Sequence, residues 1–160
     1  MKVCVFAGTF DPITIGHTFV IEKCLEIFDK VVIALGVNQE KTPMFDIQAR
    51  KKMIELAVSN SDRVEITSFE GMLVDFMKKN NIKVNVRGIR NQDVYKYETT
   101  MERFNRDMYK DMTTLYIPTP KELVHISSSA IRNILNLGAD ASEYLPKAVC
   151  EFIRAEKKSK

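Results

Sequence analysis

The stretch VCVFAGTFDPITIGH, from Val3 to His17, decides the fold class of this 160-residue chain. Its first five residues are apolar, which predicts a short buried strand. Gly8 then permits a tight turn, and the Asp-Pro pair at positions 11 and 12 is a further turn signal. A pattern of helical period begins near Gly16. A buried strand that leads through a turn into a helix is the first half of a βαβ unit.

The rest of the chain repeats this alternation. Apolar runs rich in β-branched residues predict strands at Val3–Ala7, Val31–Val37, Val64–Thr67, Val84–Arg87 and Leu115–Ile117. The second run is apolar throughout, which is typical of a parallel sheet covered on both faces. We therefore expect an α/β fold, a single domain over residues 1–160 with an open, doubly wound parallel sheet. Ligands bind such sheets outside the carboxyl ends of the strands.

Two of the helices have specific signals. Asp46 stands where a helix N-cap is expected. The longest apolar stripe recurs every three or four residues and comprises Val94, Tyr97, Met101, Phe104 and Met108. Such a stripe predicts a helix that packs this face inward, Tyr97 included.

Composition excludes several classes of protein. The chain has 45% hydrophobic and 28% charged residues, and its net charge of +3 is too small to indicate a nucleic-acid binder or a membrane-surface protein. Cys4, Cys24 and Cys150 form an odd set without a C-x-x-C pair, which favours buried free thiols in a reducing compartment. No apolar run is long enough for a membrane span or a signal peptide, so we expect a cytoplasmic protein.

The segment GTFDPITIGH also carries chemistry. A helix N-terminus presents free N–H groups and the positive end of its dipole, and it therefore attracts anions. Thr9 and His17 add a hydroxyl and one of only two imidazoles in the chain at this point. The alternative is a plain strand-to-helix loop with a capping histidine. No G-x-G-x-x-G and no P-loop sequence is present, so dinucleotide redox chemistry and P-loop hydrolysis are not favoured.

The same segment resembles the T/H-x-G-H signature of the nucleotidyltransferase α/β-phosphodiesterase superfamily, and ISSSAIR at Ile126–Arg132 resembles its second signature. Within that superfamily the chain is similar to the bacterial phosphopantetheine adenylyltransferase family along essentially its whole length. The further matches are KTPMF at Lys41–Phe45, RGIR at Arg87–Arg90 and the Tyr97–Glu98 pair. The resemblance implies a Rossmann-like nucleotidyltransferase fold and transfer of the adenylyl group of ATP to 4′-phosphopantetheine, which gives dephospho-coenzyme A and pyrophosphate.

That reaction needs no general base, because the attacking phosphate is already ionised. Catalysis then consists of positioning and charge stabilisation. The expected catalytic residues are His17, Lys41, Thr9 and Arg90. His17 would donate to the α-phosphate, Lys41 would bridge the two reacting phosphates, and Thr9 would orient the acceptor. Taken alone, Arg87 or Arg90 would more often form a surface salt bridge. The three serines at 127–129, taken alone, would more often cap a helix.

The resemblance also implies the binding residues. Those expected to contact 4′-phosphopantetheine are Thr9, Lys41, Leu73 and Arg87. Those expected to contact ATP are Thr9, Phe10, His17, Gly88, Ile89, Arg90, Glu98, Leu123, Val124, His125, Ile126, Ser127, Ser128 and Ser129. Mg²⁺ is expected as a cofactor bound through ATP, without protein side-chain ligands.

The resemblance further implies a homohexamer and feedback by coenzyme A. Two related enzymes are alternatives, a dinucleotide-forming adenylyltransferase and a cytidylyltransferase, and the RGIR segment argues against both. A regulatory module that binds the nucleotide without turnover is an alternative of another class. His17 and Lys41 argue against it, because binding alone does not need both groups at the reacting phosphate.

Overall fold

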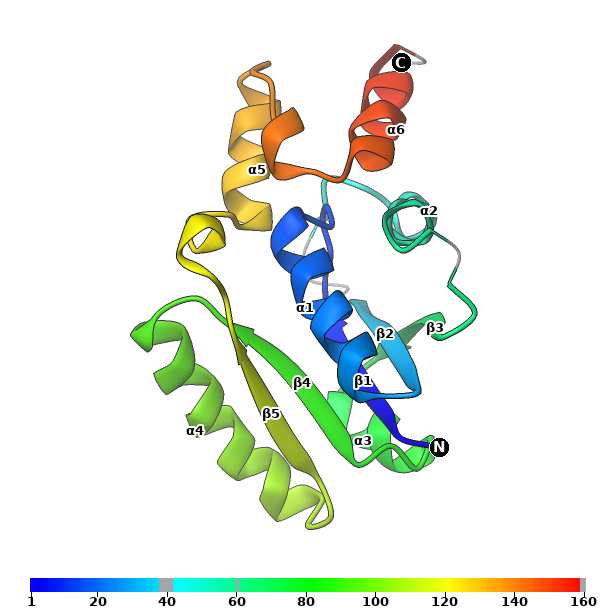
Figure 1. The fold of residues 1–160 in the computed structure, drawn as a ribbon, viewed down its shortest axis with the longest axis vertical. Coiled ribbons are helices and arrows are strands. Elements are labelled where there is room, and N and C mark those ends of the chain that lie inside the picture. The colour runs from blue at the N-terminus through cyan, green and yellow to red at the C-terminus, as the bar shows by residue number, and fades with distance from the viewer. Residues whose placement is uncertain (38–41, 60, 159–160) are drawn as a thin grey trace.

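Five parallel strands form one sheet in the computed structural model, which describes residues 1–37, 42–59 and 61–158 (Figure 1). The strands are β1 Val3–Gly8, β2 Lys30–Val37, β3 Val64–Glu70, β4 Val84–Ile89 and β5 Thr113–Pro118. Their order in the sheet is β3-β2-β1-β4-β5. All five predicted strands are therefore confirmed, and so is the open parallel sheet.

In the described ranges, six α-helices connect and flank the strands. They are α1 Ile15–Ile27, α2 Ile47–Ala57, α3 Leu73–Lys79, α4 Gln92–Met108, α5 Ser128–Asn136 and α6 Lys147–Lys158. Short 3₁₀ turns, η1 Lys121–Leu123 and η2 Ser142–Tyr144, precede α5 and α6. The predicted cap at Asp46 is confirmed, because its Oδ1 accepts the Ala49 N–H at 2.8 Å.

Strands β1 and β2 bury both of their faces. On one face Cys4, Phe6 and Ile33 join a core with residues of α1, α2, α5 and α6. On the other face Val5 and Val32 pack with residues of α3. Burial of each large apolar side chain contributes about 1.5–3 kcal/mol, so this two-sided burial is the main stabilisation of the sheet.

The order of the strands reverses at β1, since β2 and β3 lie on one side of it and β4 and β5 on the other. Crossovers of one handedness then require the helices after β3 and β4 to cover the opposite face from α1. This arrangement agrees with two observations. Helix α3 packs in the core that contains Val5 and Val32, and α4 contacts Arg87. The carboxyl ends of β1 and β4 thus open onto a space between two layers of helices.

Four of the five residues in the apolar stripe of α4 do not pack inward as predicted, and the fifth, Val94, is only partly buried. Tyr97 is 66% exposed and Phe104 59%, and no residue of α4 is buried. The side of α4 turned towards the sheet instead carries Glu98, which pairs with Arg87 of β4. Amphipathic spacing predicts that the apolar face of a helix is covered. It does not predict whether the sheet of the same chain covers that face. In this chain the apolar face is left on the surface.

The expected burial of the three cysteines is confirmed. Cys4, Cys24 and Cys150 are buried free thiols. Within the described residues, none of the helices combines the length and the apolar character that crossing a membrane requires.

Candidate active site

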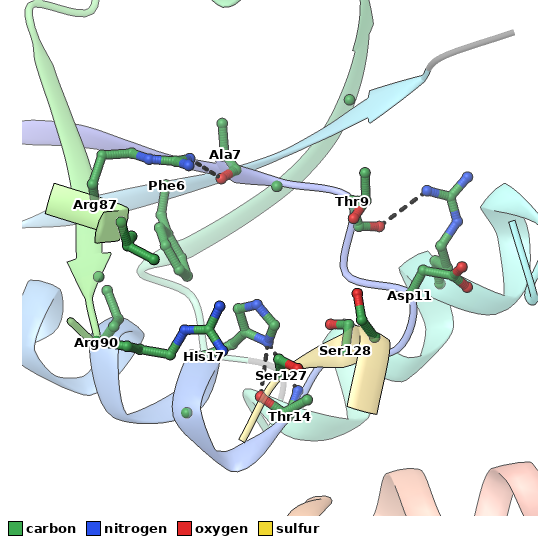
Figure 2. Close-up of a pocket in the computed structure, with 18 of the residues that line it drawn as sticks. Phe6, Ala7, Thr9, Asp11, Thr14, His17, Arg87, Arg90, Ser127 and Ser128 are labelled. Atoms are coloured by element: carbon green, nitrogen blue, oxygen red, sulfur yellow. Dashed lines mark hydrogen bonds between the residues drawn. The ribbon is translucent and has the colours of Figure 1, made fainter. Parts of the chain in front are cut away.

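A cleft of about 910 Å³ lies where β1 and β4 end. Its walls come from the loop after β1, the end of β4, and the starts of α1 and α5, and Figure 2 shows side chains from these segments around one space. The position is the point of strand-order reversal, where ligands bind open α/β sheets. The volume suits a nucleotide-sized ligand. The two signature loops, far apart in the sequence, therefore share one cleft.

His17 is held in a single tautomer at the start of α1. The backbone N–H of Thr14 donates to His17 Nδ1 at 3.0 Å, and the Thr14 hydroxyl lies 3.0 Å from the same nitrogen (Figure 2). Because Nδ1 accepts a hydrogen bond, the proton of the neutral ring is on Nε2. His17 lines the cleft and is thus fitted to donate Nε2–H to a ligand oxygen.

The imidazole is also kept neutral. Burial, together with the positive charges of Arg90 and Arg87, lowers the pKa of His17 to about 4. The ring of Phe10 contributes to this apolar setting, since its centroid lies 5.1 Å from that of His17 in an edge-on arrangement. At neutral pH His17 is therefore a neutral hydrogen-bond donor beside two guanidinium groups.

The loop after β1 depends on Gly8. A Cβ at Gly8 would lie 3.2 Å from the ring of Phe10, so a larger residue would displace that ring. Phe10 has a φ of 48° and is 1% exposed, and its side chain belongs to the core. What Phe10 can offer to a ligand is therefore its backbone alone.

The two arginines of the RGIR segment have different partners. Arg87 forms an ion pair with Glu98 of α4 and donates to the Ala7 carbonyl at 2.9 Å. Arg90 donates to the Ile126 carbonyl at 3.1 Å and has no carboxylate partner among the described residues. Gly88, between them, is needed because a Cβ there would lie 2.9 Å from Val20 of α1.

The serine cluster closes the cleft from α5. Ser127 is the N-cap, and its hydroxyl accepts the Ala130 N–H at 3.1 Å. The Ser128 hydroxyl donates to the Pro12 carbonyl at 2.8 Å and so ties α5 to the first signature loop. The start of α5 thus points into the same cleft as the start of α1, and its dipole adds to the attraction for anions.

Asp11 organises the loop that precedes α2, a role the sequence analysis missed. Its carboxylate accepts the N–H groups of Met44 and Phe45 at 2.8 and 2.9 Å. Arg132 of α5 donates to the Asp11 carbonyl at 2.8 Å. The D-P turn signal predicted a bend at this position, but the partners of the carboxylate lie more than thirty residues away.

The charges of the cleft do not balance. The described lining residues include four arginines, Arg50, Arg87, Arg90 and Arg132, and two carboxylates, Asp11 and Glu98. With His17 neutral, two positive charges remain. A polyanionic ligand such as a triphosphate would offset this excess.

Most of the predicted ligand contacts meet in this cleft. The predicted residues that line it are Thr9, His17, Leu73, Arg87, Gly88, Arg90, Glu98, Ile126, Ser127, Ser128 and Ser129. Among the described residues, five predicted ATP contacts are not part of its lining: Phe10, Ile89, Leu123, Val124 and His125. His125 instead faces the Tyr144 ring at 5.9 Å. Lys41 lies outside the described residues.

The donor set of the cleft suits a metal bound through a nucleotide. No group of three or more histidine, cysteine, aspartate or glutamate side chains in the described part of the chain could hold a metal ion. Both cleft carboxylates are engaged, Asp11 by backbone amides and Glu98 by Arg87. Mg²⁺ prefers phosphate oxygens and water in such sites, so the residues present fit an ion carried in by ATP.

The chain is similar to known adenylyltransferases. Residues 5–134 match the cytidylyltransferase-like family. The phosphopantetheine adenylyltransferase of Heliobacterium modesticaldum is 38% identical over 149 residues, which cover 93% of this chain and 89% of that protein. That of Clostridium tetani is 38% identical over 153 residues, 96% of each chain.

A solved structure supports the fold. The nicotinic acid mononucleotide adenylyltransferase of Plasmodium falciparum, complexed with NaAD, has a TM-score of 0.72 and 17% identity, and the match covers 97% of this chain and 95% of that one. At this identity the likeness shows the fold alone. The family is shown by the sequence comparisons, because the family model matches most of the chain and curated enzymes are 38% identical to it over nearly the full length. The chain belongs to the phosphopantetheine adenylyltransferase family.

Proposed function

We propose that the chain transfers the adenylyl group of ATP to 4′-phosphopantetheine, with dephospho-coenzyme A and pyrophosphate as products, in coenzyme A synthesis. The observation that carries the proposal is the cleft itself, in which His17 and the start of α5 meet under an excess of two positive charges. The names of the curated relatives point to the same reaction.

The proposed chemistry is a direct in-line displacement. An oxygen of the acceptor phosphate attacks the α-phosphorus of ATP, the bond from that phosphorus to the bridging oxygen of the β-phosphate breaks, and the electron pair leaves with pyrophosphate. No covalent enzyme intermediate is involved. Charge grows on the α-phosphoryl oxygens, and a neutral His17 with its proton on Nε2 is suited to donate to one of them.

The positive groups divide between the two substrates. We assign Arg90 and the start of α5 to the β- and γ-phosphates of ATP, because Arg90 is bonded to Ile126 beside the serine cluster. We assign Arg87 to the acceptor phosphate. To bind this phosphate, Arg87 must break its ion pair with Glu98. Lys41 is proposed as the bridge between the reacting phosphates. These roles amount to positioning and charge neutralisation.

The other end of the cleft is apolar. Val37, Phe69 and Leu73 line it at the carboxyl ends of β2 and β3. An apolar wall suits the pantetheine arm, which is long and uncharged. Leu73 is the predicted contact for that arm, and its place in the lining supports this role.

Mg²⁺ is proposed as the cofactor, held by phosphate oxygens of ATP and by water. When bound, it would neutralise charge on the phosphates. The chain's own part is to hold the triphosphate through Arg90 and the α5 start.

We propose a homohexamer, and the exposed stripe of α4 supports self-association. Tyr97, Met101, Phe104 and Met108 are all at least 36% exposed along one side of this helix. A continuous apolar stripe of this kind is stabilised when a second copy covers it. The number of six subunits rests on the family resemblance.

Light scattering of the Phe104→Glu variant tests self-association through α4. We expect this variant to give a smaller particle, while Arg103→Glu on the same helix, away from the stripe, keeps the size of the wild type. A Phe104→Glu particle as large as the wild type would contradict the proposal.

Coenzyme A is proposed as a feedback ligand and the cytoplasm as the compartment. Coenzyme A shares the phosphopantetheine moiety with the acceptor and can therefore compete for the same cleft. Three buried free thiols suit a reducing compartment.

Release of pyrophosphate from ATP tests the reaction. Separate assays would contain 4′-phosphopantetheine, nicotinate mononucleotide or nicotinamide mononucleotide as the acceptor. We expect turnover with 4′-phosphopantetheine, and none above background with the other two. Preference for a mononucleotide would identify a dinucleotide-forming enzyme, and ATP binding without release in any assay would identify a regulatory module.

A further inference from the structure

Arg50 is a buried cation of the cleft that neither the motifs nor the family resemblance singles out. It lies in α2, is 5% exposed and lines the cleft. Its Nη1 donates to the Thr9 carbonyl at 3.0 Å. Its Nε is buried and has no hydrogen-bond partner among the described residues. Buried polar atoms nearly always have a partner, so an orphaned guanidinium nitrogen at a ligand cleft requires an explanation.

Within residues 1–37, 42–59 and 61–158, the positive charge of Arg50 also lacks a counter-ion. No carboxylate of the described residues lies within 4.0 Å of its guanidinium, although every other arginine of the cleft except Arg90 has one. Asp11 is taken by two amides and Arg132, and Asp46 caps its own helix. A buried charge without a counter-ion destabilises the folded chain. A negatively charged ligand beside Arg50 would offset this destabilisation.

Another arginine in the chain shows what a purely structural role looks like. Arg63, at the opposite edge of the sheet, donates to the carbonyls of Leu25, Phe28 and Asp29. Its guanidinium is thus well supplied with backbone acceptors, next to solvent. In the part of the chain that the structure describes, Arg50 makes a single carbonyl bond, and it lines the cleft. A carbonyl clamp does not account for Arg50.

We propose that Arg50 binds the phosphate of the acceptor substrate, a phosphomonoester, at the Thr9 end of the cleft. This inference rests on the proposed function. Arg50 holds the carbonyl of Thr9, which is the residue expected to orient the acceptor. Arg90 and the α5 start, which we assign to ATP, have no bond to Arg50 among the described contacts. Arg50 and Arg87 then grip the acceptor phosphate from α2 and β4, with guanidinium geometry suited to phosphate.

Titration calorimetry with three ligands tests the proposal. The ligands are 4′-phosphopantetheine, pantetheine without the phosphate, and ATP, each with the wild type, Arg50→Gln and Arg50→Lys. We expect Arg50→Gln to weaken 4′-phosphopantetheine about tenfold or more, since an arginine–phosphate bond is charge-assisted. Binding of pantetheine and ATP should be unchanged, and Arg50→Lys should restore part of the loss. Arg63→Gln, which also removes arginine–carbonyl bonds, is the matched control and should bind all three normally.

Three results would overturn the role of Arg50. They are unchanged 4′-phosphopantetheine binding in Arg50→Gln, an equal loss for pantetheine, and a loss confined to ATP. If Arg50→Gln does not fold, NMR of the wild type decides, with the Nε–H signal assigned through Arg50→Lys. That signal should move with 4′-phosphopantetheine and not with pantetheine, and an unmoved signal at saturation contradicts the proposal.

Failure of the proposed function would look different. In that case the wild type itself would not use 4′-phosphopantetheine in the pyrophosphate assay. If a mononucleotide is the acceptor instead, the same comparison of Arg50 variants with that phosphomonoester and its dephosphorylated form decides whether Arg50 binds the acceptor phosphate.

Discussion

The two edges of the sheet differ in how their charges are neutralised. At the amino ends of the strands, Lys30 pairs with Glu65 at 2.6 Å and Lys83 with Asp111 at 3.0 Å. Arg63 is bonded to three carbonyls at the same edge. At the carboxyl ends, Arg50 and Arg90 have no carboxylate partner among the described residues.

Stability alone would favour neutralising both edges, because an unpaired charge in a partly buried site is unfavourable. One edge is neutralised by the chain's own groups, and the other is left with two excess positive charges and a neutral donor, His17. The difference indicates where a ligand supplies the missing negative charge. Substitutions at the carboxyl edge should therefore change ligand binding and catalysis, and those at the amino edge should not.

The largest effect is expected from His17→Ala. Loss of the Nε2–H donor should lower kcat about 10²- to 10³-fold, as for other donors that act on a developing charge. The dissociation constant for ATP should change little, because the donor acts mainly in the transition state. Single-turnover kinetics and ATP calorimetry measure the two quantities. Equal losses in both would mean that His17 is a binding residue.

The neutral state of His17 should appear in the pH dependence of stability. Its pKa is about 4 in the folded chain and near 6.5 when unfolded. Between these values the unfolded chain binds the extra proton, so stability falls as the pH drops from 6.5 to 4, by up to about 3 kcal/mol for this group. Urea unfolding should show this loss in the wild type and less of it in His17→Gln. Identical pH profiles for the two proteins would contradict the lowered pKa.

A smaller effect is expected from Arg87→Gln. The acceptor phosphate loses one charge-assisted contact, so KM for 4′-phosphopantetheine should rise about 10- to 100-fold. KM for ATP should stay within about threefold, which corresponds to less than 1 kcal/mol. Steady-state kinetics with each substrate varied in turn distinguishes the assignments. An increase in KM for ATP alone would contradict the assignment of Arg87 to the acceptor phosphate.

The smallest effect is expected at the amino edge. Lys83→Met removes an exposed ion pair with Asp111, and such pairs contribute little to stability because water and salt screen them. Neither kcat nor either KM should change, and the midpoint of thermal unfolding should fall by only a few degrees. A marked loss of activity in this variant would remove the contrast between the two edges.

Strand positions and the order of the two signatures could be predicted because they depend on local pattern. Burial of β1 and β2 on both faces makes their sequences apolar throughout, and the glycine turn after β1 has its own composition. Parallel strands then bring their carboxyl ends to one edge. From this it followed that His17 and the α5 serines would meet in a shared cleft, as they do.

The role of Asp11, the burial of Arg50 and the exposure of α4 could not be predicted in this way. Asp11 meets Met44 and Phe45, and Arg50 meets Thr9, across more than thirty residues of chain. The stripe of α4 has the spacing of a buried face, and yet Glu98 is the residue turned to the sheet. Spacing reports which residues share a side of a helix and not which side meets the sheet.

By itself, then, the sequence determined the alternation of strands and helices, the two phosphate-binding segments and the family resemblance, because each depends on neighbours along the chain. The tertiary structure decided the tautomer and lowered pKa of His17, the pairing of Arg87 with Glu98 and the unpaired charge of Arg50. These properties depend on distance and burial between segments that only folding brings together.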